Sequence, residues 1–261
     1  VLSEVLVKLS DNMEKQQEFR GKVVGALIYP VIIVIGMVGV ALIMMIFVIP
    51  RLLSLYSEFD AELPMPTRVL MGVSGFMAKF WPIIFLGLGG AIYGFYMYRK
   101  TQAGRYKTDE KILKIPLIGP LITQIILTDL TRTLSMMVGA GVSILEGLNI
   151  SSEVVNNSVI SKALKDAAKD VEKGFPVAYS FAKRAEVFPY ILSQMIAVGE
   201  ETGKMDEVLQ KLSHIFEVES DQKVKSLTAA IEPLIMVILG IGVGFLVIAV
   251  ILPIYNLTSQ F

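Results

Sequence analysis

The pattern of hydrophobic and polar positions divides this chain into polar segments separated by three long apolar windows. None of the windows contains Asp, Glu, Lys or Arg; they are Val23–Pro50, Phe80–Tyr98 and Pro233–Phe261. A helix needs about 20 apolar residues to cross a bilayer core of about 30 Å. The second window is the shortest, but aromatic residues typical of the membrane interface stand at both of its ends. The pattern therefore predicts three transmembrane helices, at 23–50, 80–98 and 227–254.

Lys and Arg are distributed unevenly around these windows. Six of them fall within 99–114, directly after the second window, whereas 51–79 carries three, balanced by three acidic residues. Because cytoplasmic flanks carry the excess of basic residues, we expect 99–226 and the N-terminal residues to be cytoplasmic. The loop 51–79 and the tail 255–261 are then expected outside. The alternative, a buried core helix in place of a span, fits the second window best.

The chain contains an internal repeat at an offset of 203 residues. The sequence SEVLVKLS at 3–10 aligns without a gap with DEVLQKLS at 206–213. At the same offset, Pro30 aligns with Pro233 and Pro50 with Pro253. Each copy is an amphipathic helix that leads into a proline-entered membrane helix. A soluble region precedes the second copy, so we expect a similar soluble domain ahead of Val1.

Turn and capping residues divide the polar region 99–226 into six short helices. Glycine and proline punctuation predicts helices at 119–138, 143–156, 158–174, 176–185, 189–200 and from 204 towards the third span. Ser143 and Glu146 have the spacing of a capping box, and Ser158 is the expected cap of the third helix. No window alternates with the period of a strand. The predicted fold class is an all-α membrane protein, with three transmembrane helices and a cytoplasmic six-helix bundle.

Composition narrows the possible functions. Hydrophobic residues make up 54% of the 261 residues and charged residues 18%, with a net charge of zero. A balanced charge is not the basic excess of a nucleic-acid-binding protein, so we expect no nucleic-acid partner. The chain has no cysteine and one histidine, His214. Thiolate zinc sites and multi-histidine metal sites are therefore excluded, and we predict no enzymatic activity, no metal and no cofactor.

Three motifs carry a resemblance to a known family. The sequence LTRTLSMMVGAGVSILEGL at 130–148 resembles the helix–turn–helix opening of the F domain of the type II secretion system F family. The sequence GEETGKM at 199–205 is similar to a turn of that domain, and LPMPTR at 63–68 to the loop between its first two spans. The resemblance covers essentially the whole chain. It implies an inner-membrane platform protein with three membrane helices and two six-helix cytoplasmic F domains.

The resemblance implies a domain order and a function. It makes this chain an N-terminally truncated member, in which 1–22 end the first cytoplasmic F domain and 99–226 form the second. Residues 23–50, 80–98 and 227–254 are then the spans, with 51–79 and 255–261 periplasmic. The implied function is the platform of a type IV pilus assembly machine, which couples a cytoplasmic ATPase to pilin extraction and polymerisation. The alternative is the equivalent platform of a type II secretion system, which assembles a pseudopilus.

The same resemblance implies several partners. They are a hexameric assembly ATPase, pilin or pseudopilin subunits and other inner-membrane assembly proteins, with the chain itself in a homo-oligomer, a dimer or a trimer. A membrane transporter fragment is a weaker alternative, since transporters have internal repeats but also place ionisable groups at mid-membrane. The three apolar windows contain no Asp, Glu, Lys or Arg, and Glu232 lies just before the third window.

Three acidic residues are candidates for partner contacts. Glu200 and Glu201 lie in the turn closed by Gly199 and Gly203, whose spacing does not match a phosphate-binding loop. Glu232 precedes Pro233 at the mouth of the third span, where a charge is costly and often functional. It is a candidate contact for the positive N-terminus of a pilin helix. The alternative is an interfacial carboxylate in water.

Other glycines have structural interpretations. Gly139 and Gly141 are expected to break the first helix of the bundle, as Gly199 and Gly203 are expected to end the fifth. Small residues at a spacing of three or four allow close approach of membrane helices; they are Gly87, Gly90, Gly94, Gly240 and Gly244. Packing within the chain and packing between subunits both remain open for these faces.

Overall fold

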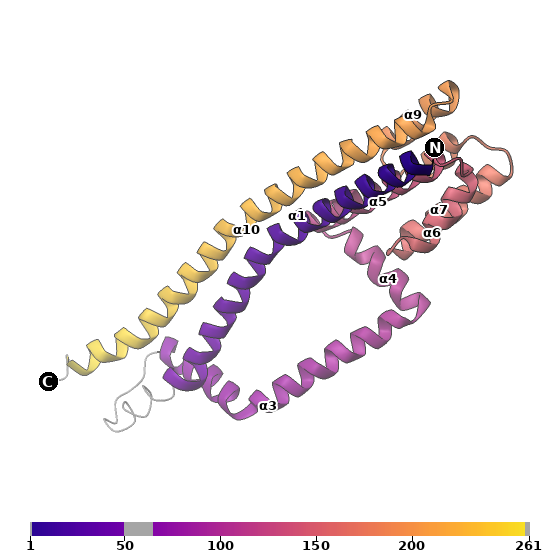
Figure 1. The fold of residues 1–261 in the computed structure, drawn as a ribbon. Coiled ribbons are helices and arrows are strands. Elements are labelled where there is room, and N and C mark those ends of the chain that lie inside the picture. The colour runs from indigo at the N-terminus through magenta and orange to yellow at the C-terminus, as the bar shows by residue number, and fades with distance from the viewer. Residues whose placement is uncertain (1, 50–64, 259–261) are drawn as a thin grey trace. The chain divides into compact units, whose positions relative to one another are not determined.

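The computed structural model describes residues 2–49 and 65–258, and the regular structure of that part is helical throughout (Figure 1). One segment is a short π-helix, η1, which continues the first helix. The elements in chain order are α1 (Leu2–Ile43), η1 (Met44–Val48), α3 (Met65–Lys100), α4 (Gln102–Leu113), α5 (Ile118–Gly139), α6 (Ile144–Val154), α7 (Ser158–Glu172), α8 (Val177–Ala182), α9 (Tyr190–Thr202) and α10 (Met205–Thr258). The prediction of an all-helical protein is confirmed.

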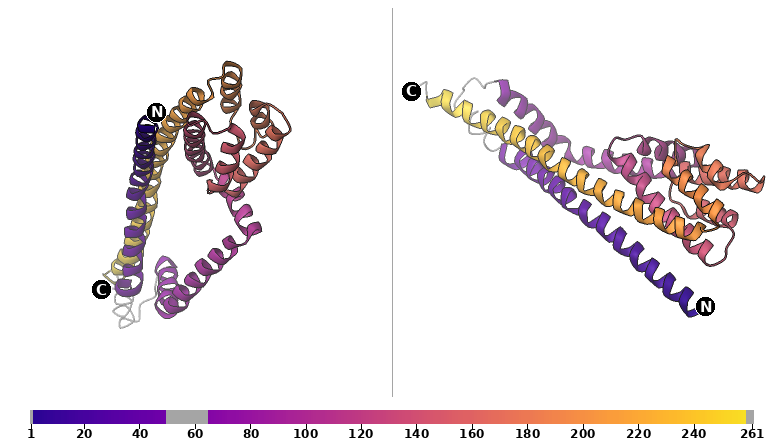
Figure 2. Two further views of the ribbon diagram at one scale, coloured as in Figure 1. Left: turned by 45° about the vertical axis from the view of Figure 1, so that its right-hand side comes forward. Right: turned by 90° about the horizontal axis from the view of Figure 1, so that it is seen from above.

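Two compact units can be distinguished by their internal contacts. The bundle unit comprises Val1–Gly25 and Met97–Leu227, and the apolar unit comprises Ala26–Tyr96 and Thr228–Phe261. Both α1 and α10 are unbroken helices to which each unit contributes residues, as the two views of Figure 2 also show. The repeated sequences therefore each form one continuous helix, and the prolines at positions 30 and 233 lie inside these helices rather than at their starts.

The core of the bundle unit is built from leucine and phenylalanine residues at helical spacing. On α10, Leu209, Leu212 and Phe216 are fully buried and recur at intervals of three and four residues. This spacing places them on one face of the helix. They pack in one cluster with residues of α5, α6, α7, α8 and α9 and of the segment before α9, among them Leu127, Leu134, Leu148, Ile160, Leu164, Phe181, Phe188, Leu192 and Ile196. Burial of this stripe fixes α10 against the shorter helices.

The helices of the bundle unit differ from the predicted ones in two respects. First, α4 was not predicted; it has almost no amphipathic pattern, and its capping residue Thr101 accepts a hydrogen bond from the Gly104 amide. Second, α7 is capped by Asn157, whose side chain accepts from the amides of Val159 and Ile160. The predicted cap, Ser158, instead donates to the carboxylate of Asp109. The predicted cap was therefore wrong by one residue.

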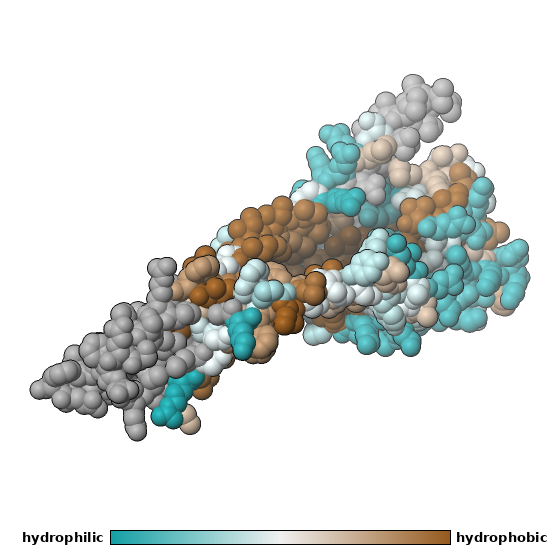
Figure 3. Space-filling view, turned by 90° about the horizontal axis from the view of Figure 1, so that it is seen from below, coloured by the Kyte–Doolittle hydropathy of each residue, from teal (hydrophilic) through white to brown (hydrophobic). Residues whose placement is uncertain are grey.

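The apolar unit contains the second halves of α1 and α10 and most of α3. Its large aliphatic side chains are widely exposed; Ile35 is 65% and Leu86 79% exposed. Figure 3 shows hydrophobic side chains gathered in the middle of the view and hydrophilic ones mostly toward its right-hand side. The one buried polar residue that we single out there, Ser74 of α3, donates a hydrogen bond to the carbonyl of Met45 in η1. Its partner lies in the π-helical turn, where the regular α-helical ladder is interrupted.

Four helical segments are long and apolar enough to cross a membrane: Gln17–Phe47, Lys79–Lys100, Ile118–Gly139 and Met205–Phe245. Three overlap the predicted spans. The fourth is α5, whose most apolar window is 44% buried within the protein against at most 6% for the others. α5 also carries the buried polar residues Gln124 and Arg132, so its apolar face is used by the bundle core.

The segment predicted as the loop 51–79 is helical from Met65 onward, as the first part of α3. Residues 50–64, which include Pro50 and the first two residues of the LPMPTR motif, lie outside the described residues. The same holds for 259–261 of the predicted tail.

Candidate functional site

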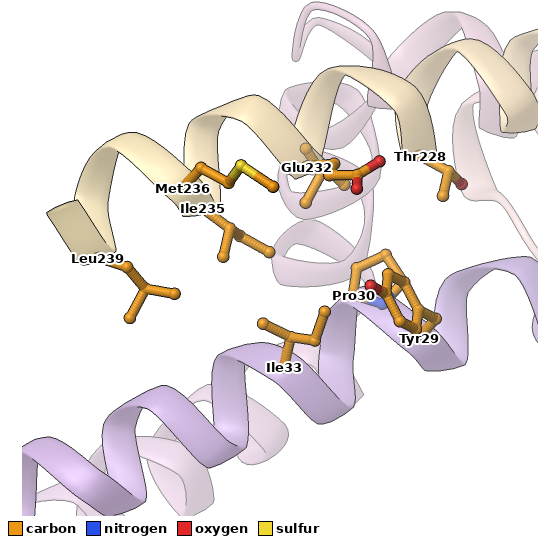
Figure 4. Close-up of a pocket in the computed structure, with 9 residues that line it drawn as sticks. Tyr29, Pro30, Ile33, Thr228, Glu232, Ile235, Met236 and Leu239 are labelled. Carbon is orange, nitrogen blue, oxygen red and sulfur yellow. The ribbon is translucent and has the colours of Figure 1, made fainter.

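A cavity in the apolar unit lies between α1 and α10 (Figure 4). Its volume is about 180 Å³, and we call it the Glu232 cleft. α1 contributes Tyr29, Pro30 and Ile33, and α10 contributes Thr228, Ile231, Glu232, Ile235, Met236 and Leu239. Of the sequence-predicted candidates, Glu232 is the one that the structure places in a cavity.

The cleft lies where the two copies of the repeat meet. Tyr29 and Glu232 are equivalent positions at the offset of 203 residues, and so are Ile33 and Met236. All four line the cleft, one of each pair on each helix. The two copies thus present the same helix positions to a shared space, but with a phenol on one side and a carboxylate on the other.

Pro30 removes one backbone hydrogen bond from the part of α1 that lines the cleft. The residue is buried and lies inside α1. Proline has no N–H, so it cannot donate to the carbonyl of the residue four positions earlier, Ala26. That carbonyl lies one turn away on the same side of the helix. A backbone acceptor therefore lies on the side of α1 that lines the cleft.

The side chains of the cleft combine one carboxylate with apolar walls. Glu232 and Tyr29 are exposed, the latter by 57%, while Ile235 is 7% exposed. None of the nine lining residues in this described part of the chain is basic. Such an arrangement suits the binding of a positively charged group at the end of an apolar one.

Glu200 has a structural partner. Its two carboxylate oxygens accept hydrogen bonds from the amides of Val177 and Ala178, at 2.7 Å and 2.8 Å. These amides are the first of α8, whose own capping residue, Pro176, makes no side-chain cap. A carboxylate is favourable at this positive end of a helix. Glu200 thus joins the end of α9 to the start of α8, while Glu201 is exposed on α9.

The four glycines singled out as turn residues lie in or beside the last turns of α5 and α9. Gly141 and Gly203 have φ of +88° and +69°, a region that side chains other than glycine rarely adopt. Gly203 closes α9, and its amide donates to the Gly199 carbonyl. Gly199 is needed for another reason, since a Cβ there would lie 3.3 Å from the Cα of Met205. Gly139 ends α5 beside Asp206.

The glycines of the predicted packing faces have open surroundings. A Cβ added at any of them would meet nothing within 4 Å; they are Gly87, Gly90, Gly94, Gly240 and Gly244. Close packing of helices at these glycines is thus not used within the described part of the chain. Packing against other subunits stays a prediction.

A buried ion pair between α5 and α10 was missed from the sequence. Arg132 donates to Glu217 at 2.6 Å, with side-chain exposures of 6% and 22%. The guanidinium also lies 6.0 Å from the ring centre of Phe19 on α1. The arginine on α5 therefore lies against two other helices of the bundle unit, α1 and α10. The residue lay within the motif at 130–148, but nothing in the sequence named its partner 85 positions away.

A second polar centre of the bundle unit lies beside α7. Asp170 is 10% exposed and accepts from Arg184 at 2.8 Å, with Lys183 at 3.6 Å. The hydrogen bond from Arg184 holds the pKa of this carboxyl below its ordinary value. Asp109 has a similar position between Arg99, at 3.0 Å, and the amide of Ser158, at 2.8 Å. These carboxylates fix short helices to one another.

Comparison with known proteins gives a consistent result. The family model described as Type II secretion system (T2SS), protein F, matches residues 1–50 and 130–253. A type IV pilus assembly protein PilC of Thermus thermophilus is 35% identical over 97% of this chain and 62% of its own length. PilC of Pseudomonas aeruginosa is 33% identical over 98% of this chain and 68% of its own length.

A relative from the secretion systems is equally similar. The type II secretion system protein F of Xanthomonas campestris is 33% identical over 99% of this chain and 64% of its own length. The chain thus spans somewhat less than two thirds of the Thermus and Xanthomonas relatives. The residues matched by the family model include parts of both the bundle unit and the apolar unit.

Proposed function

The chain belongs to the type II secretion system protein F family, and we propose that it acts as an inner-membrane platform of a type IV pilus assembly machine. The observation that carries the proposal is the similarity to type IV pilus assembly proteins along almost the whole chain. The alternative, the platform of a type II secretion system, is supported by the relative named for that machine. In either machine the protein is a scaffold, without catalytic chemistry of its own.

The proposed topology follows the apolar segments and the basic flanks. Three spans, at 23–50, 80–98 and 227–254, place 1–22 and 99–226 in the cytoplasm. The loop 51–79 and the tail 255–261 are then periplasmic. We assign α5 to the cytoplasmic part because its apolar face is buried and because it carries Arg132 and Gln124, which are costly in lipid. Single reporter fusions after residues 60 and 110 test the assignment, since the two must report opposite sides of the membrane.

The proposed mechanism uses α10 as the connection between the cytoplasmic part and the membrane. Leu209, Leu212 and Phe216 bind the first part of this helix into the bundle core, while the residues from Pro233 onward are uncharged. A displacement of the bundle by a cytoplasmic ATPase would then pass along one continuous helix to the third span. Pilin or pseudopilin subunits are the proposed recipients of that displacement.

A helix break tests this mechanism. Ser226 is exposed on α10 between the core residues and the apolar segment. Ser226→Pro removes a helical hydrogen bond and costs roughly 3 kcal/mol in a helix interior, whereas Ser226→Ala preserves the helix and serves as the control. We expect pilus assembly in complemented cells to be lost with proline and retained with alanine, at equal amounts of membrane-inserted protein. Full assembly with the proline variant would contradict the mechanism.

A binding experiment tests the proposed partner. The detergent-solubilised chain is immobilised and exposed to the hexameric assembly ATPase of the same organism, and retention is measured with and without nucleotide. Glu201 is the better of the two acidic candidates for this contact, because Glu200 already caps α8. We expect Glu201→Gln to weaken retention and Glu186→Gln, an exposed carboxylate elsewhere on the bundle unit, to leave it unchanged. Absence of retention would contradict the partner assignment.

A further inference from the structure

We propose that the Glu232 cleft binds a primary ammonium group carried by an apolar membrane helix, with the Glu232 carboxylate as the counter-ion. The inference rests on the proposed function in one respect, the choice of a membrane-anchored subunit as the partner. The cavity, its charge and its lining are independent of that choice.

The size of the cleft limits what can enter it. A volume of about 180 Å³ is similar to the roughly 150 Å³ of an engineered cavity that accepts benzene. A single side chain or the end of a chain fits such a space, whereas a helix about 10 Å wide does not. The cleft therefore receives one terminal group of a partner, and the body of the partner lies beside α1 and α10.

The charge of the lining selects a cation without an attached anion. Glu232 is the one acidic residue among the nine, and none is basic. An anionic group would meet the carboxylate without a compensating positive charge. A zwitterionic lipid head group would place its ammonium near Glu232 but find no cation for its phosphate. A lone ammonium meets one carboxylate, and charge-assisted hydrogen bonds of this kind are the strong ones.

The position of the cleft along the helices adds the apolar requirement. Glu232 is the last charged residue before the uncharged stretch that starts at Pro233. On α1, Tyr29 lies within the first uncharged window. Ile32 and Ile35, which follow it in the same window, are 63% and 65% exposed. A ligand whose charge pairs with Glu232 therefore continues along aliphatic surface. An apolar helix with a free amino terminus, or with a lysine at its end, has this combination of charge and surface.

The absence of cysteine makes a direct test possible. Met236→Cys places a unique thiol on the cleft lining, because the chain has no cysteine of its own. The 261-residue chain with this substitution is reconstituted in phosphatidylcholine vesicles at pH 7. The probe is a synthetic 20-residue apolar helix with a free amino terminus and a thiol-reactive group on its second residue. The matched probe is the same peptide with an acetylated terminus.

We expect about tenfold more cross-linking with the free amine than with the acetylated peptide, the ratio that one charge-assisted hydrogen bond supplies. Glu232→Gln in the same background must reduce the cross-linking of the free-amine peptide to the level seen with the acetylated peptide. Tyr29→Phe, which keeps the ring, tests the opposite wall and must give a smaller, severalfold reduction. Glu186→Gln, which removes a carboxylate on the bundle unit, must leave the ratio unchanged.

Two outcomes overturn the proposal. One is equal cross-linking of the two peptides, or a ratio that survives Glu232→Gln. The other is loss of the ratio when phosphatidylethanolamine replaces half of the phosphatidylcholine, since a lipid head group would then be the occupant. No pilus machinery takes part in this assay, so its failure leaves the proposed function intact. Conversely, a failure of complementation in cells would leave the ammonium site standing.

Discussion

The first parts of α1 and α10 carry the same repeated sequence, and both belong to the bundle unit, but their equivalent side chains have different surroundings. On α10, Phe216 is fully buried, whereas its equivalent on α1, Met13, is 55% exposed. The reverse holds six residues later, where Phe19 of α1 is 2% exposed and its equivalent on α10, Gln222, is exposed. A repeated amphipathic pattern thus fixes which residues share a face, while the neighbouring helices decide which face is covered.

The largest expected effect is a loss of stability at Phe216 that is absent at its equivalent position, Met13. Phe216→Ala removes a large side chain from a filled site, and we expect the free energy of unfolding to fall by about 4 kcal/mol. Met13→Ala acts on an exposed side chain and is expected to change the free energy of unfolding by less than about 0.5 kcal/mol. Chemical unfolding of the purified chain in mild detergent, followed by helical circular dichroism, measures both. Equal losses would show that α1 is covered to the same extent as α10.

A second pair of equivalent positions compares carboxylates. Glu217→Ala leaves the buried Arg132 without its ion-pair partner, and we expect a loss of about 3 kcal/mol in the same unfolding experiment. The equivalent residue on α1, Glu14, is exposed, and its replacement by alanine is expected to be nearly neutral.

The double variant Arg132→Met with Glu217→Leu is the control for this pair. Replacing both charges with apolar side chains avoids the unpaired buried arginine, so most of the lost stability should return. A double variant as unstable as Glu217→Ala alone would mean that the arginine contributes more through Phe19 than through the ion pair.

The third prediction concerns the turn at which the α10 copy begins. Gly203→Ala forces a side chain into a left-handed conformation, φ +69°, at a cost of about 1 kcal/mol. Gly139→Ala is the matched control, because the nearest atom to its added Cβ lies at 3.9 Å, an ordinary contact, and its φ is not positive. We expect the control to be neutral or slightly stabilising in the same assay.

The smallest expected effect is a pH dependence of the bundle that covers α10. Because the pKa of Asp170 is lowered in the folded state by Arg184, its stabilising contribution is present above the unfolded-state pKa of about 3.9. That contribution is lost as the pH falls through the lower folded-state value. Unfolding measured between pH 6 and pH 3 should therefore show a shallower acid dependence for Asp170→Asn than for the unchanged chain.

Local signals predicted much of the bundle. Uncharged windows located the apolar segments, and glycines such as Gly141 and Gly203 marked helix ends because few other residues adopt their conformations. The polar helix α4 was missed, since it buries little apolar surface and so has no hydrophobic period to detect. The capping residue of α7 was misplaced because Asp109, 49 positions earlier, binds the Ser158 hydroxyl.

Long-range pairs explain what could not be predicted of the candidate site. The sequence singled out Glu232 by its place beside an uncharged stretch, and it identified Tyr29 as the equivalent residue. It did not indicate that both line one cavity, because that depends on how α1 and α10 face each other. The ion pair between Arg132 and Glu217 could not be predicted for the same reason. Its two residues are 85 positions apart, and only the packing of α5 against α10 brings them together.

The proline in the wall of the cleft has a mechanical consequence. A helix is stiff because each turn is tied to the next by backbone hydrogen bonds, and α1 lacks one such tie at Pro30. Bends in helices concentrate at such positions. The cavity is therefore built at the most compliant turn of its own wall, where the work needed to widen or narrow it is least. A change in the width of the cleft is therefore expected to be taken up first by a bend of α1 at Pro30.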